Sequence, residues 1–191
     1  MAFVFVFLLV ACGFVLAVYV LVFNGLTTAV TKVEEGWTGI EVQLKRRHEL
    51  IPQLVSVVRS AVAHEKDIFD KLLEARTAAI SAMASHDPNT VSEAEGELGQ
   101  ALGRFISFAE DNVEITATEN ISKFQTQLEE TADQIAASRR LYNGNVQDLN
   151  ARIAGFPGNL IAPRHGIKKA SSFELSEAER SEVQTHPDVS I

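Results

Sequence analysis

The stretch that decides the fold is TENISKFQTQLEETADQIAASRRLYNGNVQDLNARIA, residues 118–154. Apolar and small side chains recur there every three or four residues, at Ile121, Phe124, Leu128, Thr131, Ile135, Ser138, Tyr142, Val146, Leu149 and Ile153. This spacing predicts one amphipathic helix of more than about eight turns, a length typical of helical bundles. Thr118 is the predicted N-cap, and Gly155 and Pro157 end the helix. The fold class is therefore all-α.

Three more helices are predicted upstream. The first continues from the N-terminal segment to about Leu50, the second runs from there to Met83, and the third is capped by Thr90 or Ser92. The sequence His-Asp-Pro-Asn at 86–89 separates the second from the third. Short connections between long helices favour antiparallel neighbours, so residues 25–156 are predicted to form an elongated antiparallel four-helix bundle.

Pro52 leaves two alternatives open for the boundary between the first two helices. Proline has no N–H and restricts the residue before it, here Ile51. Pro52 therefore either begins the second helix as an early-turn residue or kinks one long helix.

The N-terminal residues Ala2 to Phe23 carry no charged side chain. About 20 apolar residues suffice to cross the ~30 Å hydrocarbon core as a helix, so residues 1–24 are predicted to be a transmembrane anchor. A cleaved signal peptide is disfavoured because no Lys or Arg precedes the run. Leu9-Val10-Ala11-Cys12 resembles a lipoprotein signal, but the apolar run continues beyond Cys12.

The residues around the anchor suggest its orientation and its packing. Lys32, and farther on Lys45 to Arg47, follow the span, which favours an N-terminus outside and a cytoplasmic soluble domain. Gly13 and Ala17 form a small-xxx-small pair, a pattern that lets transmembrane helices approach closely. We expect this pair to serve helix packing between spans, although small residues also occur in spans without that role.

Composition and motifs narrow the classes of function. The net charge of −8 argues against nucleic-acid binding, which requires a basic surface. The five histidines form no i, i+4 pair, and no Glu-x-x-His occurs, so the sequence predicts neither a metal site nor another cofactor. No Gly-x-Ser-x-Gly or Gly-rich phosphate loop is present. We therefore expect no enzymatic activity.

The densest basic cluster, Lys45-Arg46-Arg47, has two interpretations. It is either a solvated helix face with local ion pairs to Glu41 and Glu49, or Arg47 pairs with an acidic group on another helix and fixes the register of the bundle.

Topology predicts a second contact with the membrane. If the first helix leaves the bilayer and directions alternate, the fourth helix returns toward it. Residues 157–191 then form a membrane-proximal segment followed by a flexible tail. Apolar side chains and cations stand together in its first part, and we expect them to touch anionic lipid or a neighbouring subunit: Phe156, Leu160, Ile161, Arg164, Lys168 and Lys169. The alternative is an ordinary loop that caps the bundle.

Several motifs resemble the LemA family of bacterial membrane proteins. They are WTGIEVQLKRRHELIPQL (37–54), Glu74-Ala75-Arg76, Ala101 to Arg104, Leu128 to Thr131, Arg139 to Asn143 and Phe156 to Asn159. The resemblance implies a single span with the N-terminus outside and an antiparallel bundle in the cytoplasm, at the bacterial inner membrane. It implies no reaction, and an association of some members with organelle membranes would suggest membrane organisation.

Together these observations favour a non-enzymatic membrane-anchored scaffold that self-associates as a homo-oligomer and organises membrane or partner proteins. The alternative is a monomeric adaptor for a membrane protease or signalling protein, whose partner would be that membrane protein.

Overall fold

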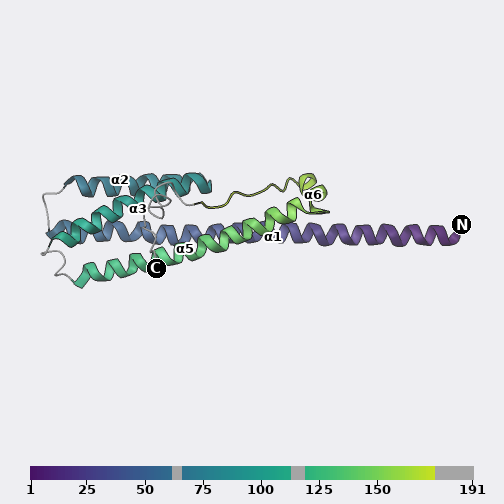
Figure 1. The fold of residues 1–191 in the computed structure, drawn as a ribbon, viewed down its shortest axis with the longest axis horizontal. Helices are drawn as coiled ribbons and strands as arrows, with labels where there is room; N and C mark the ends of the chain where they lie inside the picture. Colours follow the sequence, from purple (N-terminus) through teal and green to yellow (C-terminus); the bar gives the residue numbers. More distant parts are fainter. Residues whose placement is uncertain (62–65, 113–118, 175–191) are drawn as a thin grey trace, which may run out of the picture. The chain divides into compact units, whose positions relative to one another are not determined.

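The described residues, 1–61, 66–112 and 119–174 of a computed structural model, are all-α (Figure 1). The helices are α1 (Ala2–Ala61), α2 (Lys66–Met83), α3 (Pro88–Asp111), α5 (Glu119–Ala154), α6 (Gly158–Ile161) and the 3-10 helix η1 (Ala162–His165). A long apolar N-terminal helix followed by a helical bundle confirms the predicted fold class. The predicted cap at Thr118 and most of the predicted flexible tail lie outside the described residues.

The chain divides into two compact units. Unit 1 comprises Met1–Thr38 and Arg140–Ser172, and unit 2 comprises Gly39–Arg139 and Phe173–Ile191. Helices α1 and α5 each contribute to both units. The units therefore cut across the predicted segments 1–24, 25–156 and 157–191.

The core of unit 2 is built from one apolar stripe on each of four helices. Its buried members include Ile51, Leu54, Val58, Phe69, Leu72, Leu98, Leu102, Phe105, Ile121 and Leu128. Phe69, near the start of α2, meets Phe105, near the end of α3, edge to face at 5.7 Å between ring centroids. Because an early residue of one helix faces a late residue of the next, α2 and α3 are antiparallel, as the short connection between them predicts.

Helix α3 begins earlier than predicted. Its N-cap is Asp87, whose carboxylate accepts hydrogen bonds from the backbone N–H and the hydroxyl of Thr90, and Pro88 occupies the first turn. These two bonds hold the pKa of Asp87 below its usual value. The prediction of Thr90 or Ser92 as the cap was wrong, because Asp87 already supplies the acceptor that the first turn needs. Ser92 is buried and donates to the carbonyl of Glu174.

Helix α1 does not end at Pro52. It continues through the proline to Ala61, and α2 begins at Lys66. The prediction that a helix ends near Leu50 was therefore wrong, and of the two alternatives for Pro52 the long helix is the one observed.

In unit 1, α1 and α5 run antiparallel and approach closely. The side-chain amide of Asn145 donates to the carbonyl of Lys32 at 2.7 Å, and Trp37 meets Tyr142 edge to face at 5.6 Å. A Cβ on Gly36 would lie 3.1 Å from the Cα of Tyr142. Only glycine fits this crossing without a shift of the backbone.

Candidate functional site

Helix α1 is the one described helix that is long and apolar enough to cross a membrane. Its apolar window, near the N-terminus, is not buried inside the protein, and most side chains between Phe3 and Leu21 are exposed. Exposed Phe, Val and Leu in such density are suited to lipid rather than water. These features favour a single-pass membrane anchor.

The C-terminal end of this apolar stretch is covered by residues 156–169, which we call the collar. Leu26 of α1 is buried together with Ile161 and Ala162, and Tyr19, Val22 and Phe23 pack around them. The hydroxyl of Tyr19 and Nε2 of His165 share a hydrogen bond of 2.6 Å, and the His165 ring lies 4.4 Å from that of Phe23. Unit 1 thus brings the collar beside the last turns of the apolar segment.

The predicted membrane-contact residues divide into two groups. Phe156 and Leu160 are 83% and 56% exposed, and Arg164, Lys168 and Lys169 are also exposed. Ile161 is only 4% exposed and packs on Leu26. Ile161 therefore belongs to the core of unit 1 and does not offer its side chain to lipid, because the short helix α6 turns one face inward.

The backbone around the collar is tightly fixed. A Cβ on Gly158 would overlap the carbonyl oxygen of Arg152, so this position accepts only glycine. The Phe156–Pro157 peptide bond is cis. After the collar, Asn150 exchanges two hydrogen bonds with the backbone of Ala170, at 2.9 and 3.0 Å, and the Tyr142 hydroxyl donates to the carbonyl of Ser171. Side chains of α5 thereby secure the chain that leaves the collar.

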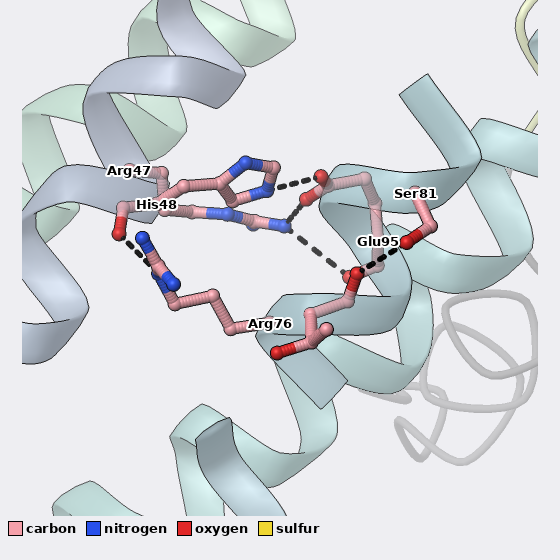
Figure 2. A network of polar contacts seen from close by, with 6 residues as sticks. Arg47, His48, Arg76, Ser81 and Glu95 are labelled. Carbon is pink, nitrogen blue, oxygen red and sulfur yellow. Dashed lines mark hydrogen bonds and ion pairs between the residues drawn. The ribbon is translucent and has the colours of Figure 1, made fainter. Parts of the chain in front are cut away.

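Unit 2 contains a polar cluster, which we call the polar node: Arg47, His48, Arg76 and Glu95 (Figure 2). His48 and Glu95 are buried, and Arg47 and Arg76 are partly buried. The guanidinium of Arg47 pairs with Oε2 of Glu95 and also donates to its backbone carbonyl. Nε2 of His48 donates to the other carboxylate oxygen at 2.7 Å. The pairing of Arg47 with an acid on another helix, one of its two interpretations, is confirmed.

Arg76, on α2, joins the node through its side chain, which binds the backbone of His48. Its Nε donates to the carbonyl oxygen of His48 at 2.7 Å, as Figure 2 shows. In a regular helix that carbonyl would accept from the N–H of residue 52, which is a proline and has none. Arg76 therefore supplies the hydrogen bond that Pro52 cannot make, and α1 continues.

The charge state of the node follows from its burial. His48 is 3% exposed, and burial, with the nearby cations Arg47 and Arg76, lowers its pKa from 6.5 to about 4. A neutral His48 that donates from Nε2 suits an ionised Glu95, whose charge is balanced by Arg47. This balance lets three helices meet around charged groups inside a bundle.

The other predicted positions lie on the outside of α1. Gly13 and Ala17 are exposed, and a Cβ on Gly13 would meet no atom within 4 Å. Cys12 is a free, exposed thiol. Across the described residues, no group of three or more His, Cys, Asp or Glu is arranged to hold a metal ion.

Comparison with known proteins decides the family. Residues 36–189 match the LemA family, which is more than half of the chain. The chain belongs to the LemA family.

Three known proteins are similar in sequence to this chain at low identity. Magnetosome protein MamQ 2 of Paramagnetospirillum magneticum is 25% identical over 179 residues, and magnetosome protein MamQ of Magnetospirillum gryphiswaldense is 22% identical; each alignment covers 82% of this chain. Protein LemA of Metamycoplasma hominis is 23% identical over 181 residues, 94% of this chain and 81% of its own. The chain spans 66% of the length of the MamQ proteins, about two thirds.

Three of the six LemA-like motifs lie at the polar node or at the start of the collar. The long motif at 37–54 contains Arg47 and His48 of the polar node, and also Pro52. The motif Glu74-Ala75-Arg76 contains Arg76, which binds the carbonyl of His48. The motif at 156–159 begins the collar and contains Gly158. These three motifs therefore contain residues that hold the helices and the collar in place.

Sequence reasoning missed the roles of Glu95 and Arg76 in the node, although the sequence carries a signal for each. Glu95 follows Val91 by four residues and precedes Leu98 by three, so it occupies the apolar stripe of α3, where a carboxylate needs a buried partner. Pro52 marks the carbonyl of His48, four residues earlier, as lacking a helical donor. That the missing donor would come from Arg76 depends on the packing of α2, which the sequence does not contain.

Proposed function

We propose that this LemA-family chain is a non-enzymatic membrane-anchored helical scaffold, which self-associates to organise membrane or partner proteins. The single observation that carries the proposal is the continuity of α1. One helix runs without a break from the apolar anchor at Ala2 into the bundle at Ala61. Anchor and bundle are thus parts of one element, as suits a protein that positions other molecules at a membrane.

The buried polar groups support a structural use. Among the described residues four polar side chains are buried, those of His48, Ser92, Glu95 and Thr131. Each is hydrogen-bonded within the protein: His48 to Glu95, Ser92 to the carbonyl of Glu174, and Thr131 to the carbonyl of Gln127. The hydrogen bonds of these side chains link helices or chain segments, or lie within one helix. This structural use favours a scaffold over an enzyme.

Self-association is proposed through the small-residue face of the span. Gly13 and Ala17 leave a shallow exposed strip on α1, which would let a second copy of the helix approach closely. The MamQ relatives are called magnetosome proteins, a name that mentions no reaction. An organising role in this chain is in keeping with those names.

We propose an N-terminus outside and a cytoplasmic bundle at the bacterial inner membrane. Lys32 follows the apolar segment, and the collar adds Arg164, Lys168 and Lys169 in the same unit. The same cations, with exposed Phe156 and Leu160, would touch anionic lipid at that surface. A C-terminal fusion to green fluorescent protein should fluoresce in cells, and a fusion to alkaline phosphatase should be inactive; the reverse pattern would refute the orientation.

The test of the scaffold is the mass of the full-length protein in mild detergent. We expect a discrete oligomer, and a shift toward monomer in Gly13→Leu/Ala17→Leu. The matched control is Ala11→Leu/Val15→Leu, which adds bulk about 160–200° around the helix from Gly13, and it should leave the oligomer intact. A wild-type monomer would contradict self-association and favour the monomeric adaptor.

A further inference from the structure

A small groove lies in unit 1 between the end of the apolar segment and the start of the collar. Its volume is about 320 Å³, at the lower end of the ~300–1,000 Å³ typical of ligand pockets. Leu21, Val22 and Gly25 line it from α1, Arg152 lines it from the end of α5, and Phe156 and Pro157 close it from the collar.

The groove changes character along α1. Leu21 is 71% exposed and Phe156 is 83% exposed, so its outer wall offers unshielded apolar surface. Four residues farther along the helix, about 6 Å at 1.5 Å per residue, Gly25 leaves the wall without a side chain. If the apolar segment spans the bilayer from Ala2, Leu21 lies near the edge of the ~30 Å hydrocarbon core and Gly25 lies in the headgroup layer.

The space above Gly25 is occupied by a cation. Nη1 of Arg152 lies 3.2 Å from the position that a Cβ on Gly25 would take. Nε of Arg152 donates to Asp148 one turn earlier, at 2.9 Å, and both side chains of this pair are about half exposed. The carboxylate therefore orients the guanidinium from one side and leaves its terminal nitrogen at the groove.

An apolar wall in the hydrocarbon layer and a guanidinium in the headgroup layer match one kind of molecule. Arginine recognises phosphate through charge-assisted hydrogen bonds, and an acyl chain suits the surface between Leu21 and Phe156. Arg164, Lys168 and Lys169 of the same unit add positive charge, which favours a headgroup with net negative charge.

We propose that this groove binds one anionic glycerophospholipid of the surrounding leaflet, with its phosphate on Arg152 and an acyl chain against Leu21 and Phe156. The lipid would fill the seam between the anchor and the collar and would hold them together. The proposal deepens the membrane contact proposed above and rests on the anchorage of α1, but it does not require self-association.

The test is native mass spectrometry of the full-length protein in mild detergent with added phosphatidylglycerol. Wild type should retain one phosphatidylglycerol per chain. Arg152→Gln removes the phosphate contact. Gly25→Leu places a side chain in the groove, and its Cβ would meet only the flexible end of Arg152. Each should weaken retention about tenfold, the factor that corresponds to ~1.4 kcal/mol. Arg104→Gln, a matched change of an exposed charge in unit 2, should retain lipid within about twofold of wild type.

The outcomes separate cleanly. Equal retention by wild type, Arg152→Gln and Gly25→Leu would overturn the site. An equal loss of lipid in Arg152→Gln and Arg104→Gln would also overturn it, because such a loss indicates diffuse electrostatic attraction. Tight binding of glycerol phosphate alone would overturn the role of the apolar wall. The same spectra report the number of subunits. A lipid-free oligomer would refute lipid binding in the groove and leave the scaffold proposal intact. A lipid-bound monomer would support lipid binding in the groove and contradict self-association. Circular dichroism of each variant checks that its helices remain.

Discussion

Nε of Arg76 donates to the carbonyl oxygen of His48 at 2.7 Å, and this is the carbonyl that Pro52 leaves without its helical donor. A proline inside a helix normally costs ~3 kcal/mol or more, partly through that lost bond. Here the second helix of the bundle supplies the bond. The continuity of α1 therefore depends on tertiary structure as well as on its own sequence.

This relationship predicts a specific coupling between two positions. Arg76→Met should destabilise the protein by about 1–3 kcal/mol, because the part-buried carbonyl of His48 loses its donor. Pro52→Ala restores a helical N–H to that carbonyl, so Arg76→Met should cost much less in the Pro52→Ala background. Thermal unfolding of the four proteins of this double-mutant cycle, followed by circular dichroism in detergent, measures the coupling. An equal cost of Arg76→Met in both backgrounds would contradict the account.

The charge balance of the polar node makes Glu95 its most sensitive member. Glu95→Gln leaves the largely buried guanidinium of Arg47 without a counter-charge and should cost about 3–5 kcal/mol. The matched control Glu93→Gln, on the exposed side of the same helix, should change stability by less than about 0.5 kcal/mol. The double replacement Arg47→Met/Glu95→Leu removes both charges and should recover part of the loss, because His48 then lacks the acceptor of its hydrogen bond. Similar unfolding temperatures for Glu95→Gln and Glu93→Gln would show that the pair is not needed for stability.

The lowered pKa of His48 predicts a pH dependence with a definite sign. Between pH 6.5 and about 4 the unfolded chain binds a proton at His48 and the native protein does not. The native state is therefore fully stable above pH 6.5, loses stability as the pH falls through this window, and loses no more from this group below about 4. The total is on the order of 3 kcal/mol. His48→Gln should flatten the profile of unfolding free energy against pH between 4 and 6.5, and parallel profiles for wild type and variant would argue against the assignment.

Two glycines should respond to alanine in opposite directions. Gly158→Ala places a Cβ on the carbonyl oxygen of Arg152, so it should displace the collar from α1 and expose the collar to proteolysis. Gly144, on the exposed side of α5, has no neighbouring atom within 4 Å of a new Cβ. Gly144→Ala should therefore stabilise the helix by up to about 1 kcal/mol. Limited proteolysis with mass detection of the released C-terminal fragment compares the two, and equal cleavage would show that the collar does not depend on Gly158.

The helices were predictable because their apolar stripes are long and regular, as Ile121 to Ile153 illustrate. The ends of the helices were harder to predict where a residue distant in the sequence overrides a local signal. Pro52 is a strong helix breaker in isolation, and only the packing of Arg76 against His48 removes that effect. Thr90 has cap chemistry, but Asp87 takes the role three residues earlier and binds Thr90 itself.

The candidate sites were predictable in part, because the directions of regular helices can be inferred from the sequence. Alternating helix directions predicted residues 156–169 beside the anchor, and Tyr19 and His165 meet there. The inward turn of Ile161 was not predictable, since it depends on the four-residue helix α6, which has no periodicity to read. The groove at Gly25 and Arg152 joins positions more than 120 residues apart, and no local pattern in the sequence connects them.

Disulfide crosslinking in native membranes tests self-association through the span most directly. Two full-length variants carry one cysteine each, Cys12→Ala/Ala17→Cys on the small-residue face and Cys12→Ala/Val15→Cys about 160–200° away from Ala17 and Gly13. With an added oxidant, we predict a disulfide-linked dimer for the Ala17→Cys protein and far less for the Val15→Cys protein. No dimer from either variant, or equal dimer from both, would contradict a scaffold assembled through this face of the anchor.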